Sequence, residues 1–136
     1  MKEEVSAGII LFNENEGRKF LLLNYPSGHW DFVKGKMEDG EDTKTTALRE
    51  TREETGITDI NFCDGYEEEI EYYFDIEGED IHKKVIFFLG STKTTDVKLS
   101  HEHINFIWLD FEHALKKITY ENAKNLLKKS RDFLDN

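Results

Sequence analysis

Three glutamates stand close together in this chain: Glu50, Glu53 and Glu54. Their spacing of i, i+3 and i+4 places them on one face of a helix, where three carboxylates repel one another. A hard divalent cation removes that conflict, because Mg²⁺ takes oxygen ligands and bridges to phosphates. The spacing therefore predicts a metal site suited to phosphate chemistry. The competing interpretation is a solvated acidic helix face, which is common where such residues stand alone.

The residues that flank the glutamates favour the metal site. They follow the pattern G-x5-E-x7-R-E-x-x-E-E-x-G, which begins at Gly35, ends at Gly56 and includes Glu41 and Arg49. This pattern resembles the Nudix box, the pyrophosphate-hydrolysing motif of the Nudix hydrolases. Thr51 departs from it, since the family prefers an aliphatic residue there, but the threonine methyl group can still pack. Arg49 is suited to orient a neighbouring carboxylate by a charge-assisted hydrogen bond.

A helix over Thr43–Thr55 is predicted to present the glutamates. Asp42 or Thr43 is suited to be its N-cap, and Gly56 stands where a helix end favours a left-handed residue. Gly35 is expected to form a turn that leads into this segment. The helix would then lie between two glycine turns.

Apolar runs and alternation predict the remaining elements. The expected fold class is α+β, with a mixed sheet sandwiched between helices in an α/β/α arrangement. A loop is expected at Pro26–His29 and a turn at Glu77–Asp80. Strand segments are expected at Val5–Phe12, Lys19–Tyr25, Trp30–Val33, Asp59–Gly65, Glu67–Asp75, Lys83–Ser91 and Asn105–Leu109, and further helices at Phe111–Lys117 and Tyr120–Leu134.

Composition bounds the class of protein. The 136 residues suit a single domain that spans 1–136, and 38% hydrophobic residues indicate a globular chain. The net charge of −11 argues against general nucleic-acid binding and against attraction to an anionic membrane. Cys63 is the only cysteine, which excludes an intrachain disulfide. Neither a membrane span nor a signal peptide is apparent, so a cytoplasmic location is expected.

Three stretches outside the box narrow the resemblance. They are Gly28–Trp30 before Lys34-Gly35, Glu69–Tyr72 followed by Lys83–Phe88, and Leu99–Leu109 with its Ser-His-Glu-His run. Together they resemble the asymmetrically cleaving diadenosine tetraphosphate hydrolases over nearly the whole chain. One departure is Val33, which stands where the family usually has proline before Lys-Gly, so the rigid φ of a proline is lost before Lys34.

The resemblance implies roles for particular residues. Glu50, Glu53, Glu54 and Glu102 would hold divalent ions, with Glu102 as a further ligand or a base, and Arg49 would support them. The substrate-binding residues implied are His29, Lys34 and Lys83 for phosphates, and Tyr72 and Tyr120 for adenine stacking. Each competes with a plain packing or surface role. Lys83 and Lys84 cannot be separated by charge, but strand alternation points them to opposite faces.

The activity implied is Mg²⁺-dependent hydrolysis of diadenosine tetraphosphate to ATP and AMP, with Mn²⁺ as a second possible ion. A metal-activated water would attack a phosphorus in line, and a glutamate would assist its deprotonation. Glu50, Glu54 and Glu102 all stay open as that base. Two other functions also stay open: pyrophosphohydrolysis of nucleoside triphosphates or RNA 5′ ends, and nucleotide sensing without turnover. The sequence leaves the oligomeric state open.

Overall fold

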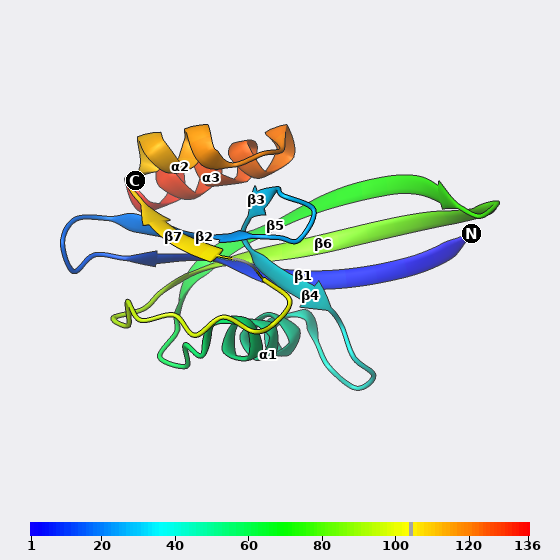
Figure 1. The fold of residues 1–136 in the computed structure, drawn as a ribbon, viewed down its shortest axis with the longest axis horizontal. Coiled ribbons are helices and arrows are strands. Elements are labelled where there is room, and N and C mark those ends of the chain that lie inside the picture. The colour runs from blue at the N-terminus through cyan, green and yellow to red at the C-terminus, as the bar shows by residue number, and fades with distance from the viewer. Residues whose placement is uncertain (104) are drawn as a thin grey trace.

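A mixed sheet of seven strands runs the length of the molecule in the computed structural model, which describes residues 1–103 and 105–136 (Figure 1). The central path runs in the order β3-β2-β1-β6-β5, while β4 pairs with β1 and β7 pairs with β2. The strands are β1 (Lys2–Asn13), β2 (Lys19–Asn24), β3 (Trp30–Asp31), β4 (Val33–Lys36), β5 (Asn61–Ile76), β6 (Glu79–Ser91) and β7 (Asn105–Leu109).

Helices cover both faces of this sheet (Figure 1). Helix α1 (Thr43–Thr55) lies on one face, and α2 (Phe111–Lys117) and α3 (Glu121–Leu134) lie on the other. The predicted α/β/α sandwich is confirmed. Within the described residues, no helix combines the length and the apolar character that crossing a membrane requires.

Strand β1 divides the core because its side chains alternate between the two faces. Ile10 and Phe12 join the apolar cluster beneath α2 and α3, while Ile9 and Leu11 join the cluster beneath α1. All four are buried. On one side β1 pairs in parallel with β6, from Lys2 opposite Ile81 to Phe12 opposite Ser91. On the other side it pairs with β4 and β2 in turn.

Several boundaries differ from those predicted. The two segments expected at Asp59–Gly65 and Glu67–Asp75 form one long strand, β5, with a register shift between Phe62 and Glu67. The expected segment Trp30–Val33 is instead two short strands, because Trp30–Asp31 pairs with β2 whereas Val33–Lys36 pairs with β1. The prediction of a turn at Gly35 was wrong: Gly35 lies inside β4, opposite Ala7.

Candidate active site

Helix α1 carries the three glutamates, and both of its ends are capped as the sequence predicted. The Asp42 carboxylate accepts a hydrogen bond from the Thr45 amide at 2.8 Å. At the other end Gly56 adopts a left-handed conformation with φ of 75°, and its amide donates to the Arg52 carbonyl. These caps satisfy terminal backbone groups and fix where the helix starts and stops.

Glu50 packs against the backbone of β4. A Cβ atom built at Gly35 would overlap the Glu50 carboxylate, so this carboxylate can lie against the strand only because residue 35 lacks a side chain. Burial raises the pKa of the Glu50 carboxyl above its usual value, although hydrogen bonding to Arg49 opposes this shift. Gly35 therefore serves close approach, and its backbone has no need of a turn conformation.

Arg49 organises the carboxylates around it. Its Nε and Nη2 donate to the two oxygens of Glu41 at 2.7 and 3.0 Å, and its Nη1 donates to Glu50 at 2.9 Å. The same Nη1 lies 3.3 Å from Glu53 Oε2, and Nη2 also donates to the Lys36 carbonyl. The hydrogen bonds that Arg49 donates to Glu41 lower the pKa of the Glu41 carboxyl to about 2. One guanidinium thus joins the helix to the segment that enters it.

Glu54 is held differently, by residues from a distant loop. Its side chain is almost fully buried, and its Oε2 accepts a short hydrogen bond from the Ser100 hydroxyl. His103 Nδ1 lies 2.6 Å from the same oxygen, with the imidazole buried as well. In the sequence these two residues stand out only as parts of the Ser-His-Glu-His run that contains Glu102. Their contacts join segments more than 45 positions apart, which spacing along the chain cannot reveal.

The loop that bears Glu102 is fastened along the end of α1. The Lys98 amide donates to the Thr55 carbonyl at 2.9 Å, and the Ser100 amide donates to the Glu54 carbonyl at 3.2 Å. The amide of Glu102 donates to the Ser100 hydroxyl oxygen at 3.2 Å. Glu102 itself is exposed. The structure therefore brings the Glu102 backbone beside the Glu54 site and leaves its carboxylate in solvent.

The donor chemistry of these carboxylates fits a hard divalent cation, since Glu50, Glu53, Glu54 and Glu102 offer only oxygen atoms. Among the residues that the structure describes, however, no three acidic, histidine or cysteine side chains converge on one point. Glu50 and Glu53 are hydrogen-bonded to Arg49, and Glu54 to Ser100. To coordinate a metal ion, these carboxylates would therefore have to give up their hydrogen bonds to Arg49 and Ser100.

A pocket of about 440 Å³ lies at the N-terminal end of α3. Lys34, Tyr72 and Tyr120 line it together with Glu121 and Asn122, so the structure brings three of the predicted substrate-binding residues together. The Tyr72 hydroxyl accepts a hydrogen bond from Asn122 Nδ2 at 2.8 Å. Tyr120 is 51% exposed and is the N-cap residue of α3. One ring is fixed and the other borders solvent, an arrangement suited to hold a flat ligand between them.

Lysines gather on the same face of the sheet. Lys83 lies opposite both Tyr72 on β5 and Glu4 on β1, whereas Lys84 points to the other face. Burial lowers the pKa of the Lys83 ammonium, and the positive charge of Lys34 lowers it further. Lys34 Nζ is 3.1 Å from the buried carboxylate of Asp31. The cluster is therefore positive and only partly neutralised.

His29 joins the pocket to the glutamate site through stacked rings. Its imidazole stacks on Tyr25 at 4.5 Å with an interplanar angle of 6°, and it lies 5.3 Å from the Tyr120 ring. Tyr25 in turn meets His103 edge-on at 4.5 Å, and its hydroxyl donates to the Phe32 carbonyl at 2.6 Å. Tyr25 was not among the predicted residues, because nothing in its local sequence marks it.

The chain is similar to known proteins over most of its length. The NUDIX domain family model matches residues 2–130. An asymmetrical bis(5′-nucleosyl)-tetraphosphatase from Caenorhabditis elegans is 35% identical over 133 residues, covering 95% of both chains. The Mus musculus protein of the same name is 33% identical over 142 residues, covering 95% of this chain and 94% of that one.

A solved structure also matches nearly the whole length of this chain. A crystal structure of a C. elegans Ap4A hydrolase binary complex matches with a TM-score of 0.85 and 33% identity, covering 97% of this chain and 98% of that chain. The similarity therefore spans the glutamate helix, the loop that holds Glu54 and the pocket alike.

Proposed function

The chain belongs to the NUDIX domain family, and from this premise we propose that it hydrolyses dinucleoside polyphosphates, converting diadenosine tetraphosphate to ATP and AMP. The observation that carries this proposal is the pairing of two sites at β4: the glutamates of α1, with Glu50 packed against this strand, and a pocket lined by Lys34 of the same strand together with Tyr72 and Tyr120. A substrate with two nucleosides and four phosphates needs both a base-binding pocket and a site for phosphate chemistry.

Members of this family require a divalent metal ion, and we propose Mg²⁺ here, with Mn²⁺ as a substitute. Glu50, Glu53 and Glu54 would hold it, with Glu102 from the neighbouring loop as a further ligand. Such an ion, when bound, neutralises phosphate charge and lowers the pKa of water. Arg49 would keep Glu50 and Glu53 oriented, because a bidentate contact to Glu41 fixes its guanidinium.

The pocket residues would bind and orient the remainder of the substrate. Tyr72 and Tyr120 would hold one adenine by stacking, which is worth about 1–3 kcal/mol per base. Lys34 and Lys83 would take the phosphates next to it, since both extend from the pocket face of the sheet. His29 would add a hydrogen bond from the edge of the pocket, where its ring lies against Tyr120.

Glu50 is the residue that we propose as proton acceptor for the attacking water. Its carboxylate lies against the backbone of β4 and accepts a hydrogen bond from Arg49 at 2.9 Å, so it is held in place beside the site proposed for the metal ion. Glu54 is less suited to this role, because Ser100 and His103 already occupy its Oε2. Glu102 is exposed and would act either as a further metal ligand or as a carboxylate beside the phosphates.

A substrate series tests this proposal. Values of kcat/KM would be compared for diadenosine tetraphosphate, diadenosine triphosphate, ATP and 5′-triphosphate RNA at one Mg²⁺ concentration. We expect the tetraphosphate to be preferred by about tenfold or more, because contacts to its full phosphate chain and its bases would add to transition-state binding. A preference for ATP or for RNA ends would overturn it. Tight binding with no turnover of any substrate would indicate a sensor.

A further inference from the structure

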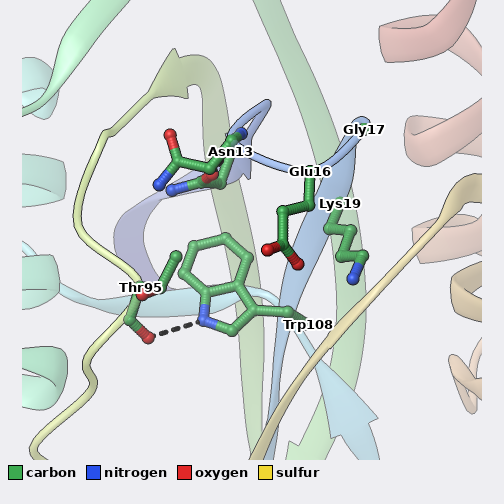
Figure 2. Close-up of a pocket in the computed structure, with 7 residues that line it drawn as sticks. Asn13, Glu16, Gly17, Lys19, Thr95 and Trp108 are labelled. Carbon is green, nitrogen blue, oxygen red and sulfur yellow. Dashed lines mark hydrogen bonds between the residues drawn. The ribbon is translucent and has the colours of Figure 1, made fainter.

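A second pocket lies where the β1–β2 turn meets the segment after β6 (Figure 2). This turn is at the opposite end of the sheet from the β5–β6 turn (Figure 1). Its volume is about 330 Å³, a size typical of small-molecule sites. None of its residues takes part in the proposed hydrolysis. The side chains that line it belong to Asn13, Asn15, Glu16, Lys19, Thr95 and Trp108.

Trp108 provides a flat wall of this pocket. Its indole Nε1 donates a hydrogen bond to the Thr95 carbonyl at 3.0 Å, which fixes the plane of the ring (Figure 2). Because the only polar atom of the side chain is occupied, the indole offers the pocket its aromatic surface. Aromatic surfaces of this kind stack planar heterocycles, and they do so with any base.

The two asparagines hold the pocket in shape. Asn13 Oδ1 accepts from the Asn15 amide at 2.8 Å, and Asn13 Nδ2 donates to the Thr94 carbonyl at 3.4 Å. Asn15 Nδ2 donates to the Lys93 carbonyl at 3.1 Å. These bonds tie the β1–β2 turn to the segment opposite. The two walls of the pocket are therefore held together by hydrogen bonds.

Glu16 and Lys19 supply the groups that select a ligand. Both line the pocket, and both extend toward the same side of the indole in Figure 2. A carboxylate offers two acceptor oxygens, and an ammonium offers donors only. A ligand that complements both groups has an edge with two adjacent donors, for the carboxylate, followed by an acceptor, for the ammonium. Guanine has this order in its amino group, its N1–H and its O6, whereas adenine presents an amino donor beside a ring-nitrogen acceptor.

We propose that this pocket binds the guanine base of a nucleoside or nucleotide. Trp108 stacks on the base, Glu16 accepts from N1–H and the amino group, and Lys19 donates to O6. This site is separate from the adenine pocket formed by Tyr72 and Tyr120, and the inference does not rest on the proposed hydrolysis. It assigns a ligand to residues that the activity leaves unused.

Isothermal titration of the full chain with guanosine and with adenosine, in buffer with EDTA, tests this inference. Guanosine carries no phosphate and EDTA removes divalent ions, so neither phosphate contacts nor a metal ion contributes to the readout. We expect saturable guanosine binding with a Kd below about 1 mM, at least about tenfold tighter than adenosine. Absence of saturation at that concentration, or equal binding of the two nucleosides, would overturn the inference.

A pair of variants locates the binding. Glu16→Gln replaces one acceptor oxygen with a donor and is expected to weaken guanosine binding by about tenfold or more. Glu14→Gln is the matched control, because Glu14 lies in the same turn, contacts Arg18 at 3.5 Å and does not line the pocket. Unchanged circular dichroism spectra would show that both variants fold. Guanosine binding that survives Glu16→Gln unchanged would place the ligand elsewhere and contradict the proposal.

Discussion

Gly35 and Glu50 are fitted to each other so closely that the glutamate carboxylate fills the space a side chain at position 35 would need. With a side chain at position 35, this carboxylate could not keep its place against β4. The glycine that opens the Nudix box therefore acts through packing against a carboxylate, and its backbone lies in an ordinary strand opposite Ala7.

This relationship predicts the effect of Gly35→Ala. The added methyl group would displace the Glu50 carboxylate, and we expect kcat to fall by about 100-fold, the scale of loss for a displaced reacting group. Thermal unfolding should change far less than activity, because residue 35 does not have a positive φ that only glycine favours. Near-normal kcat for Gly35→Ala would show that the Glu50 position is unimportant for turnover.

The forked contact of Arg49 gives a second prediction. Arg49→Lys keeps the positive charge but cannot bind Glu41 through two nitrogens while also reaching Glu50. We expect kcat/KM to fall by about 10- to 100-fold, the loss typical of residues that orient metal ligands. Arg52→Lys is the control, since Arg52 is exposed on the same helix. Equal effects of the two substitutions would argue against a specific role for the fork.

Tyr72 gives a third prediction, which separates stacking from packing. Tyr72→Ala should raise KM by about tenfold or more, because a base stack is lost. Tyr72→Phe keeps the ring and removes only the hydrogen bond from Asn122, so its KM should change less. Tyr73→Ala serves as control, since that neighbour is 66% exposed and points to the other face of the sheet. A KM for Tyr72→Ala equal to that of the control would return Tyr72 to a packing role.

The pH dependence of stability gives a fourth prediction. Arg49 lowers the pKa of Glu41 from 4.5 to about 2 in the folded protein. A depressed carboxyl pKa stabilises the folded state above pH 4.5, and this contribution is lost as pH falls through about 2. Chemical denaturation between these pH values should therefore show a shallower loss of unfolding free energy for Glu41→Gln than for wild type.

A control and a contrary result define that test. Glu67→Gln removes an exposed carboxylate from β5 and should leave the pH profile close to that of wild type. If Glu41→Gln and wild type lose stability in parallel below pH 4.5, the Arg49 contact does not govern the acid sensitivity.

Local signals in the sequence were sufficient for helix α1 and for the α2 helix. The cap at Asp42 and the left-handed Gly56 set the bounds Thr43–Thr55, and the predicted start of α2 at Phe111 coincides with the cap that the structure shows at Asp110. Such signals act within a few residues, so they are readable from a single chain. The same logic misassigned Gly35, because a glycine needed for close approach leaves the same mark in a sequence as one needed for a turn.

The contacts around Glu54 and Tyr72 could not be predicted from the sequence, for a different reason. Ser100 and His103 meet Glu54, and Asn122 meets Tyr72, only after the sheet and helices have packed. Nothing in their own neighbourhoods distinguishes them from surface residues. The family resemblance supplied Lys34, Tyr72 and Tyr120, which the fold then brings to one pocket. Their roles in binding are still predictions.

The most direct test of the account resolves the nucleotide products of diadenosine tetraphosphate incubated with the purified chain, with and without Mg²⁺. We predict equal amounts of ATP and AMP that appear only with the metal ion, and a loss of at least about 100-fold in kcat for Glu54→Gln. Two molecules of ADP would contradict the asymmetric position of attack. Products formed at the same rate without a divalent ion, or by Glu54→Gln at the wild-type rate, would contradict the role assigned to the glutamates.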